Sequence, residues 1–406
     1  MNKKEVKRAP VLRFKGFTND WEQRKLGEIA KTYSGGTPSI SNKKFYINGH
    51  IPFIKSGEIG STRTEQKINY DGLNNSSARL IETGTLLYAL YGATSGKAAI
   101  SPIDGAINQA VLAIIPQNNV NRFIYEWLNK NKSRITGKYL QGGQGNLSAK
   151  IIKQINIYIT SKNEELKISN ILRIVNKIIS LQQRKNILLY KLRKSLLSTL
   201  LTDKCTPKVR FKSFLEPLKK QKLGDMAPLR GGFAFKANNY VNTGIPIIRI
   251  SNILSNGSIG GNFAYYSEQS DDSNYILFNG SALIAMSGAT TGKTAILDLE
   301  KKKKVYQNQR VGYFTPTKNS DYSFIKAIIK SNYFLKQLNS IMVAGAQPNV
   351  SAVDIDNFTF YFPESKKEQK YIGNNFEIIN KIILLQKNRV DKLKKLKRSL
   401  LQQLFI

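Results

Sequence analysis

The sequence contains little that could form a disulfide or a metal site, because it has one cysteine, Cys205, and one histidine, His50. A single cysteine excludes an intramolecular disulfide scaffold, and the two residues together exclude almost every Cys/His metal site. Acidic residues are also scarce, with 27 Asp and Glu against 63 Lys and Arg, which gives a formal net charge of +36. A charge of this size predicts a polyanionic partner, either nucleic acid or an anionic membrane surface.

Long apolar runs are missing as well. No stretch reaches the roughly 18 apolar residues of a membrane-spanning helix, and the basic start MNKKEVKRAP has no apolar stretch behind it. We therefore expect a cytoplasmic chain that binds nucleic acid. The alternative is a soluble protein whose charge only reflects a basic proteome.

Residues arranged for catalysis are not evident. His50 has no counterpart in the second half of the chain, where Gly244 lies near its position, and Cys205 lies in a linker without a nearby base. The chain also lacks a dinucleotide fingerprint, the Asn/Asp-Pro-Pro-Tyr tetrapeptide of amino-methyltransferases and the carboxylate cluster of a nuclease. We predict that the chain is not an enzyme and that it holds no cofactor and no metal.

Two segments look like phosphate loops, GATSGK (92–97) and GATTGKT (288–294). Only three residues separate their glycines, whereas a nucleotide-binding loop has four. We expect tight β-turns instead. Their lysines, Lys97 and Lys293, either lie against a DNA phosphate or are simply solvated.

These segments belong to a duplication that covers the chain. Arg13-Phe14-Lys15 returns as Arg210-Phe211-Lys212, Asn108-Gln109 returns as Asn308-Gln309, and NKII (176–179) returns at 380–383. The repeat predicts two globular units of about 160 residues each, plus connectors. A two-fold protein in turn suggests a two-fold target.

Each half has the same internal order. Short β-rich segments such as HIPFIKS (50–56) and GIPIIRIS (244–251) alternate with turns rich in Gly, Asn and Pro. Helical stretches at 122–132 and 322–338 make each unit α+β. We predict target-binding domains at 1–160 and 204–364, and long helices at 161–203 and 365–406.

The two long helices are predicted from apolar spacings of three and four residues. Each would be about 55 Å long at about 1.5 Å per residue, and such a helix needs a partner. We expect the two to pair as an antiparallel coiled coil; the alternative is that each packs only on its own unit. The predicted coiled-coil and subunit-docking positions are Ile174, Ile178, Leu181, Leu188, Leu192, Leu196, Ile378, Ile382, Leu385, Leu396 and Leu400.

Polar residues in turns are the candidates for DNA contact, because Gln and Asn pair with adenine edges and Arg pairs with guanine. Residues that recur in both halves, Gln144 with Gln347 and Asn146 with Asn349, suggest a shared task in the fold, in phosphate contact or in partner docking. Residues that read different bases should lie where the halves differ, mainly at 38–48 with 234–243 and at 60–80 with 254–274, although such polar residues also cap and turn the backbone in many proteins. Besides the shared residues and the two loop lysines, the candidates are Lys43, Lys44, Arg63, Arg79, Arg230, Lys236, Asn238, Asn239 and Tyr265.

The order of these features resembles the specificity subunit of Type I restriction–modification systems. A β-rich unit, the late turn GGQGNLSAK (142–150) and a long heptad helix are followed by a second copy with GAQPNVSAV (345–353) and FYFPESKKEQKYI (360–372). The resemblance covers essentially the whole chain and rests on the set of motifs, each of which is weak alone. One departure is ITSKNEEL (159–166), which lacks the proline and the Glu-Gln pair of the second copy. The first junction is therefore expected to turn differently from the second.

The resemblance implies a non-catalytic scaffold with two target-recognition domains, each reading half of a split DNA site, with the helices setting the gap. It implies two modification subunits that carry S-adenosylmethionine and methylate adenine, and restriction subunits that use ATP and Mg. Two other classes stay open on the residues alone: a nucleic-acid scaffold without sequence preference, and an enzyme with an unfamiliar site. The first predicts strongly salt-dependent binding with little sequence preference.

Overall fold

The computed structural model describes residues 8–140, 146–207, 209–299, 304–342 and 349–406. The chain divides into two compact units, residues 1–183 with 389–406, and residues 184–388. Each division falls inside a long helix, α6 (Lys162–Leu200) or α11 (Lys366–Leu404), so both helices contribute to both units.

Among its described residues, the first unit forms two four-stranded sheets and one two-stranded sheet. The first sheet has the antiparallel order β2 (Ala30–Ser34), β9 (Val111–Pro116), β6 (Leu86–Ala89) and β7 (Ala98–Ile100). The second has the order β4 (Lys67–Ile68), β3 (Ile51–Ile54), β8 (Gly105–Ile107) and β5 (Arg79–Ile81), in which β3 and β8 run parallel. Strand β1 (Glu22–Lys25) pairs with β10 (Asn156–Ile159).

The second unit repeats these sheets strand for strand. Its antiparallel sheet has the order β12 (Leu229–Arg230), β19 (Val311–Phe314), β16 (Ala282–Ala285) and β17 (Thr294–Ile296). Its mixed sheet has the order β14 (Ala264–Tyr266), β13 (Ile245–Ile248), β18 (Val305–Gln307) and β15 (Ile276–Leu277), and β13 again runs parallel to β18. Strand β11 (Lys219–Lys222) pairs with β20 (Thr359–Phe362).

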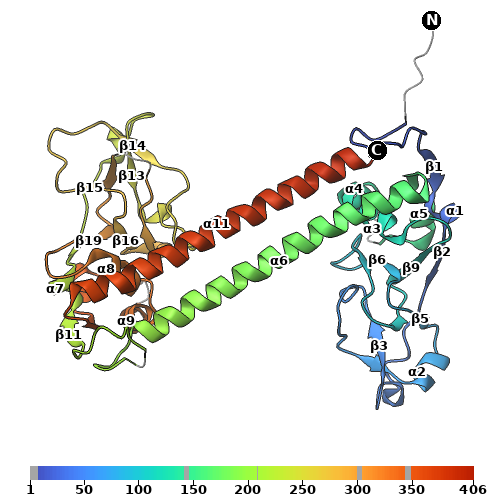
Figure 1. Cartoon of the computed structure of the whole chain (residues 1–406), viewed down its shortest axis with the longest axis horizontal. Helices are drawn as coiled ribbons and strands as arrows, with labels where there is room; N and C mark the ends of the chain where they lie inside the picture. Colours follow the sequence, from blue (N-terminus) through green and yellow to red (C-terminus); the bar gives the residue numbers. More distant parts are fainter. Residues whose placement is uncertain (1–7, 141–145, 208, 300–303, 343–348) are drawn as a thin grey trace, which may run out of the picture. The chain divides into compact units, whose positions relative to one another are not determined.

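Short helices complete each unit and confirm the predicted α+β class. In the first unit these are α1 (Leu26–Ile29), η1 (Lys43–Phe45), α2 (Tyr70–Asn74), α3 (Asn121–Lys130), α4 (Lys132–Leu140) and α5 (Ala149–Lys153). In the second unit they are α7 (Leu223–Met226), η2 (Ala237–Asn239), η3 (Ile250–Asn252), η4 (Gly288–Thr290), α8 (Tyr322–Ile328), α9 (Asn332–Met342) and α10 (Ala352–Asp356). Within the first unit, α3, α4 and α5 gather where α6 begins, while β3 and α2 lie away from it (Figure 1).

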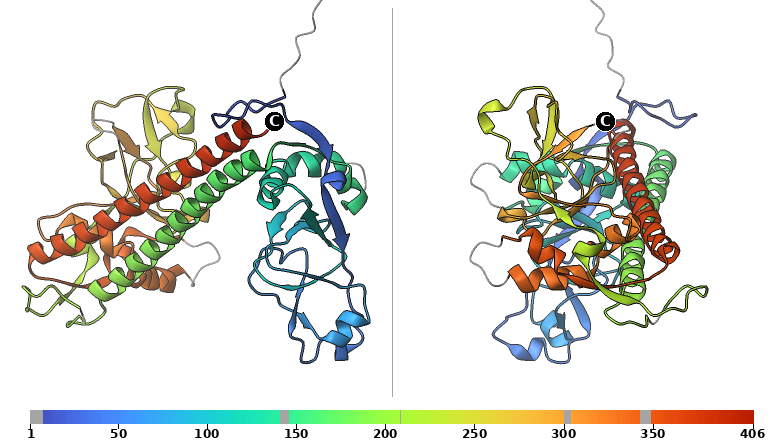
Figure 2. Two further views of the ribbon diagram at one scale, coloured as in Figure 1. Left: turned by 45° about the vertical axis from the view of Figure 1, so that its right-hand side comes forward. Right: turned by 90° about the vertical axis from the view of Figure 1, so that its left-hand side faces the viewer.

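The long helices run antiparallel, as predicted, because opposite ends of the two meet in each unit. In the first unit, Ile168 and Leu172 from the start of α6 share a core with Leu404 from the end of α11. In the second unit, Leu197 from the end of α6 packs against a core that holds Ile372 and Phe376 from the start of α11. The two helices are drawn in green and red in Figure 2.

The buried face of these helices is not the predicted one. Ile174 and Leu188 are 54% and 55% exposed. Most of the other predicted coiled-coil positions are also exposed, namely Ile178, Leu181, Leu192, Ile378, Ile382, Leu385 and Leu396. Of the predicted set, Leu196 and Leu400 are half-buried against the cores. The buried apolar positions are instead Ile168, Leu172, Val175 and Ile179 on α6, and Ile372, Phe376, Ile379, Ile383, Val390 and Leu404 on α11.

The physical reason is that each helix carries two adjacent apolar stripes with the same spacing. Spacing alone predicts that a stripe exists, but it does not say which of two stripes the chain itself covers. The structure buries one stripe in the cores and leaves the predicted stripe exposed.

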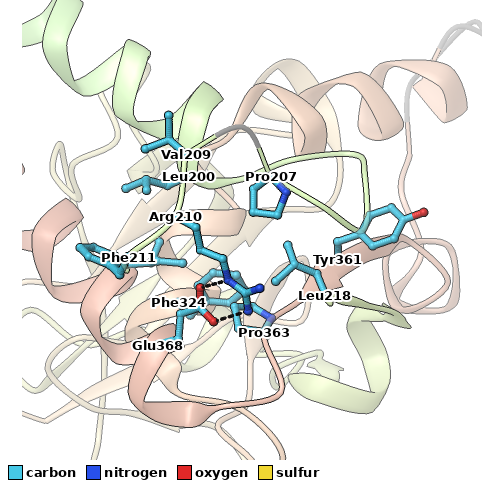
Figure 3. Close-up of a pocket in the computed structure, with 11 residues that line it drawn as sticks. Leu200, Pro207, Val209, Arg210, Phe211, Leu218, Phe324, Tyr361, Pro363 and Glu368 are labelled. Carbon is cyan, nitrogen blue, oxygen red and sulfur yellow. Dashed lines mark hydrogen bonds and ion pairs between the residues drawn. The ribbon is translucent and has the colours of Figure 1, made fainter. Parts of the chain in front are cut away.

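The two junctions that lead into the long helices have the same geometry, so the expectation of a different first turn is wrong. Arg13 pairs with Glu164 in the first turn of α6, and Arg210 pairs in the same way with Glu368 in the first turn of α11, as Figure 3 shows for the second pair. The next residue also has the same role in both copies, because Glu165 accepts a hydrogen bond from the backbone N–H of Val120 at 2.7 Å and Gln369 accepts one from Asp321 at 2.8 Å. Glu164-Glu165 therefore stands where the second copy has Glu368-Gln369.

Candidate nucleic-acid interface

The two segments that look like phosphate loops are tight hairpin turns. GATSGK joins β6 to β7, and its Gly92 and Gly96 have φ values of +85° and +79°. The second copy joins β16 to β17, with Gly288 and Gly292 at +73° and +80°. A nucleotide-binding loop leads from a strand into a helix. These turns lead into a strand, so the prediction of β-turns is confirmed.

A second turn is built by an asparagine in both units. The side-chain oxygen of Asn108 accepts a hydrogen bond from the backbone N–H of Ala110 at 3.1 Å, and that of Asn308 accepts one from Arg310 at 3.3 Å. An asparagine that bonds the backbone two residues on is typical of a turn. The asparagine of each Asn-Gln pair therefore shapes the backbone, while the following glutamine, Gln109 or Gln309, is exposed.

A third turn is formed by the glycine pair near the start of each unit. A Cβ on Gly35 would lie 1.8 Å from the carbonyl oxygen of Ile107, and one on Gly232 would lie 2.2 Å from that of Gln307. Only glycine allows this close approach to the end of the neighbouring strand. The residue that follows this glycine, Gly36 or Phe233, is thereby placed beside the Asn-Gln turn.

Backbone hydrogen bonds join these turns, and a fourth segment, into one surface. In the first unit, the N–H of Leu90 donates to Ala110 and the N–H of Leu147 donates to Leu90, both at 2.9 Å. In the second, Met286 donates to Arg310 at 3.0 Å and Val350 donates to Met286 at 2.9 Å. We call this surface the turn cluster. It comprises residues 35–37, 90–97, 108–110 and 146–147 in the first unit, and 232–234, 286–293, 308–310 and 349–350 in the second.

The turn cluster brings together four of the predicted contact residues. Asn146 and Asn349 are exposed on it, while Lys97 and Lys293 are half-buried. Their predicted neighbours Gln144 and Gln347 lie outside the described residues.

The other candidates in the first unit lie elsewhere on its surface. Lys43 and Lys44 are exposed on η1, and Lys44 lines a hollow with Tyr70 and His50, whose ring contacts the Tyr70 ring at 4.7 Å. Arg63 is exposed between β3 and β4. Arg79 is also exposed, and its guanidinium carbon lies 5.6 Å from the centre of the Tyr33 ring.

In the second unit some candidates already have partners. Arg230 donates to the carbonyl of Ile276 at 3.3 Å and packs over Tyr313, and Asn239 donates to the Tyr266 hydroxyl at 3.1 Å. Tyr265 is half-buried in β14. The exposed candidates that remain there are Lys236 and Asn238.

Several exposed or half-buried residues of the turn cluster were not among the predicted contacts, among them Thr37, Gln109, Gln309, Phe233 and Arg310. The recurring Asn-Gln pair was a signal for one turn in each unit. Sequence alone did not show which pair member faces outward, because the buried or exposed state of a turn residue depends on the strands around it.

A half-buried lysine lies at the base of the second copy of the hairpin turn. The Nζ of Lys330 donates to the carbonyl oxygen of Thr294 at 2.5 Å. Burial, together with the nearby charge of Arg193, lowers the pKa of Lys330 to about 8. The side chain therefore adds positive charge within the second unit at neutral pH and loses part of it above pH 8.

Within the ranges that the structure describes, no group of three or more His, Cys, Asp or Glu residues is placed to hold a metal ion. Within the same ranges, no helix is both long and apolar enough to cross a membrane.

The chain matches the family model of the Type I restriction modification DNA specificity domain twice, at residues 18–190 and 216–395. It is 23% identical over 407 residues to the specificity subunit of the Type I restriction enzyme MjaIX of Methanocaldococcus jannaschii, covering 95% of this chain and 92% of that one. It is 29% identical over 183 residues to the EcoR124I/EcoR124II specificity subunit of Escherichia coli, an alignment that spans 45% of that relative.

Solved structures agree in fold. The crystal structure of a Type I S subunit from M. genitalium superposes with a TM-score of 0.65 at 16% identity, covering 98% of this chain and 99% of that one. A structure from work on complex assembly in a type I R-M system superposes with a TM-score of 0.55 at 15% identity, covering 95% and 97%. With two copies of the domain in one chain, the protein belongs to the family of Type I restriction–modification DNA specificity subunits.

Proposed function

We propose that this chain binds a two-part DNA site, with residues 1–160 reading one half and residues 204–364 reading the other. The observation that carries this proposal is the turn cluster, which recurs with the same backbone hydrogen bonds in both units of a chain whose net charge is +36. Two domains that recognise different half-sites require the same backbone arrangement with partly different side chains. Phosphate contacts would supply most of the affinity, and the exposed side chains of the turns would supply the discrimination between bases.

The exposed apolar stripe of the long helices supports docking of partner subunits. Large apolar side chains such as Ile174, Leu188 and Leu385 are more than half exposed on helices that otherwise carry many charges. Contiguous exposed apolar surface marks an interaction site in a soluble protein. We infer that two modification subunits dock on this stripe, with S-adenosylmethionine bound to them, and that ATP and Mg belong to restriction subunits. The chain itself would be cytoplasmic and non-catalytic.

A selection experiment tests the reading of DNA directly. The chain, purified with its modification subunit, is incubated with duplexes of random sequence, and the bound fraction is sequenced after several rounds in about 150 mM salt. We expect enrichment of two fixed segments separated by a gap of constant length. Strong binding without an enriched motif would instead support a scaffold without sequence preference.

A further inference from the structure

The two copies of the turn cluster share a backbone but differ in several side chains, and two of the differences are large. Phe233 stands where the first unit has Gly36, and Arg310 stands where it has Ala110. Gly36 and Ala110 are buried, whereas Phe233 and Arg310 are both exposed. The second unit therefore presents a ring and a guanidinium at places where the first unit has no side chain or only a buried methyl group.

The Phe233 ring is exposed but firmly held. Its backbone N–H donates to Gln307, and its carbonyl accepts from the N–H of Gln309, both at 2.9 Å. The centre of the ring lies 5.0 Å from that of Phe235 and 4.9 Å from that of Tyr275, and these two rings pack against it. The exposed fraction of Phe233 is 45%. A side chain needed only for the core would not require this exposure, so its outward face is available to a ligand.

Arg310 lies on the neighbouring Asn-Gln turn, directly after Gln309, whose backbone N–H donates to the Phe233 carbonyl. The Arg310 backbone is fixed at both ends, because its N–H donates to Asn308 at 3.3 Å and its carbonyl accepts from Met286 at 3.0 Å. Within the described part of the chain its side chain has no hydrogen bond or ion pair. Arg230, in contrast, already donates to Ile276. Among the described residues, the five donors of the Arg310 guanidinium are thus unused, on the turn next to the one that carries Phe233.

The first unit offers a different set of groups at the same place. The Thr37 hydroxyl donates to the side-chain oxygen of Gln109 at 2.6 Å. That oxygen is therefore engaged, and the amide nitrogen of Gln109 is left as the outward-facing donor. Ala234, which aligns with Thr37, has no hydroxyl, so Gln309 lacks this constraint.

We propose that Phe233 and Arg310 determine the base preference of the second unit. Arginine forms two parallel hydrogen bonds to O6 and N7 of guanine, and phenylalanine makes apolar contact with the thymine methyl group, both in the major groove. Arg310 then selects a guanine, and Phe233 selects a neighbouring thymine, in one half-site. The first unit reads its half-site through donors, Gln109 among them. This inference rests on the proposed function, because it assigns residues to one of the two half-sites.

The test repeats the selection from random duplexes with three variants of the complex: Arg310→Ala, Phe233→Ala and the control Lys220→Ala. Lys220 is an exposed lysine on β11, in a different sheet of the same unit. In Arg310→Ala, one guanine of one half-site is expected to lose about tenfold to a hundredfold of its preference, while the other half-site stays unchanged. In Phe233→Ala, a thymine in that same half-site is expected to relax, and Lys220→Ala should keep the wild-type motif.

Two results would overturn the inference while leaving the proposed function intact: an unchanged motif in both variants, or equal weakening of both half-sites. A wild-type complex that enriches no two-part motif would overturn both. If each variant has the same thermal unfolding temperature as the wild type, a changed motif does not come from a misfolded unit.

Discussion

Arg13 donates two hydrogen bonds to the carboxylate of Glu164, from Nε at 2.8 Å and from Nη2 at 2.9 Å. Glu164 is buried at the start of α6, and Arg13 comes from the leader segment far away in the sequence. Arg210 and Glu368 repeat the pair in the second unit at 2.7 and 2.8 Å. In each unit, an arginine from the segment before the first strand is thus bonded to a glutamate at the start of a long helix.

Replacing Arg13 with alanine should destabilise the first unit by about 3 kcal/mol, because it leaves the Glu164 carboxylate buried without its partner. Burial acts to raise the pKa of Glu164, but hydrogen bonds from Arg13 and Thr160 outweigh it and lower the pKa below its ordinary value. The control is Arg24→Ala, which breaks exposed pairs with Glu22 and Glu28 and should cost at most about 1 kcal/mol. Urea unfolding of the full chain measures both, and equal effects would contradict this account.

Glu165→Gln should make the chain less sensitive to pH, since Gln369 fills the same place in the second unit. Burial raises the pKa of Glu165, although hydrogen bonds from Val120 and Asn119 partly offset it. A carboxyl whose folded-state pKa is raised contributes stability below its unfolded-state pKa and loses that contribution as pH rises through the folded-state pKa. The variant should lack this loss. Unfolding free energies at pH 4 to 8 would show it, and a variant whose stability falls with pH as steeply as wild type would refute it.

Gly96→Ala should distort the hairpin turn of the first unit and cost about 1–2 kcal/mol. The backbone of Gly96 has φ +79°, and an added Cβ would lie 2.5 Å from Cγ2 of Thr136. Gly137 on α4 gives a matched control, because a Cβ there has no atom within 4 Å. Gly137→Ala should be neutral or stabilise the helix by about 0.5–1 kcal/mol. If thermal unfolding ranks the two variants in the opposite order, the described turn geometry is incorrect.

The two apolar stripes of α6 should separate folding from partner binding. Leu172→Ala, in the buried stripe, should cost about 2–5 kcal/mol of unfolding free energy. Ile174→Lys, in the exposed stripe, should leave the unfolding free energy nearly unchanged and weaken co-purification with the modification subunit. Loss of stability in Ile174→Lys, with unchanged co-purification, would mean that the exposed stripe is covered by the chain itself.

The sequence was sufficient to predict the architecture because the duplication and the change from period-two to heptad patterning span the whole chain. It did not predict which helix stripe is buried, since Ile174 and Val175 are adjacent and both belong to apolar stripes with similar spacing. The prediction for the first junction was also wrong, because Glu165 accepts a backbone hydrogen bond in the same place as Gln369 although the residue types differ. Phe233 and Arg310 were not among the predicted contacts, because their exposure depends on the close approach of Gly232 to Gln307 and on the turn that Asn308 builds.

The central claim, that this chain directs modification to a two-part DNA site, is tested most directly by mapping methylated adenines across a host genome. The host expresses the modification subunit with this chain, and the reference strain lacks only this chain. We predict a new methylated motif in which two fixed segments flank a gap of constant length. Methylation that is unchanged between the strains, although the two proteins co-purify, would contradict the claim.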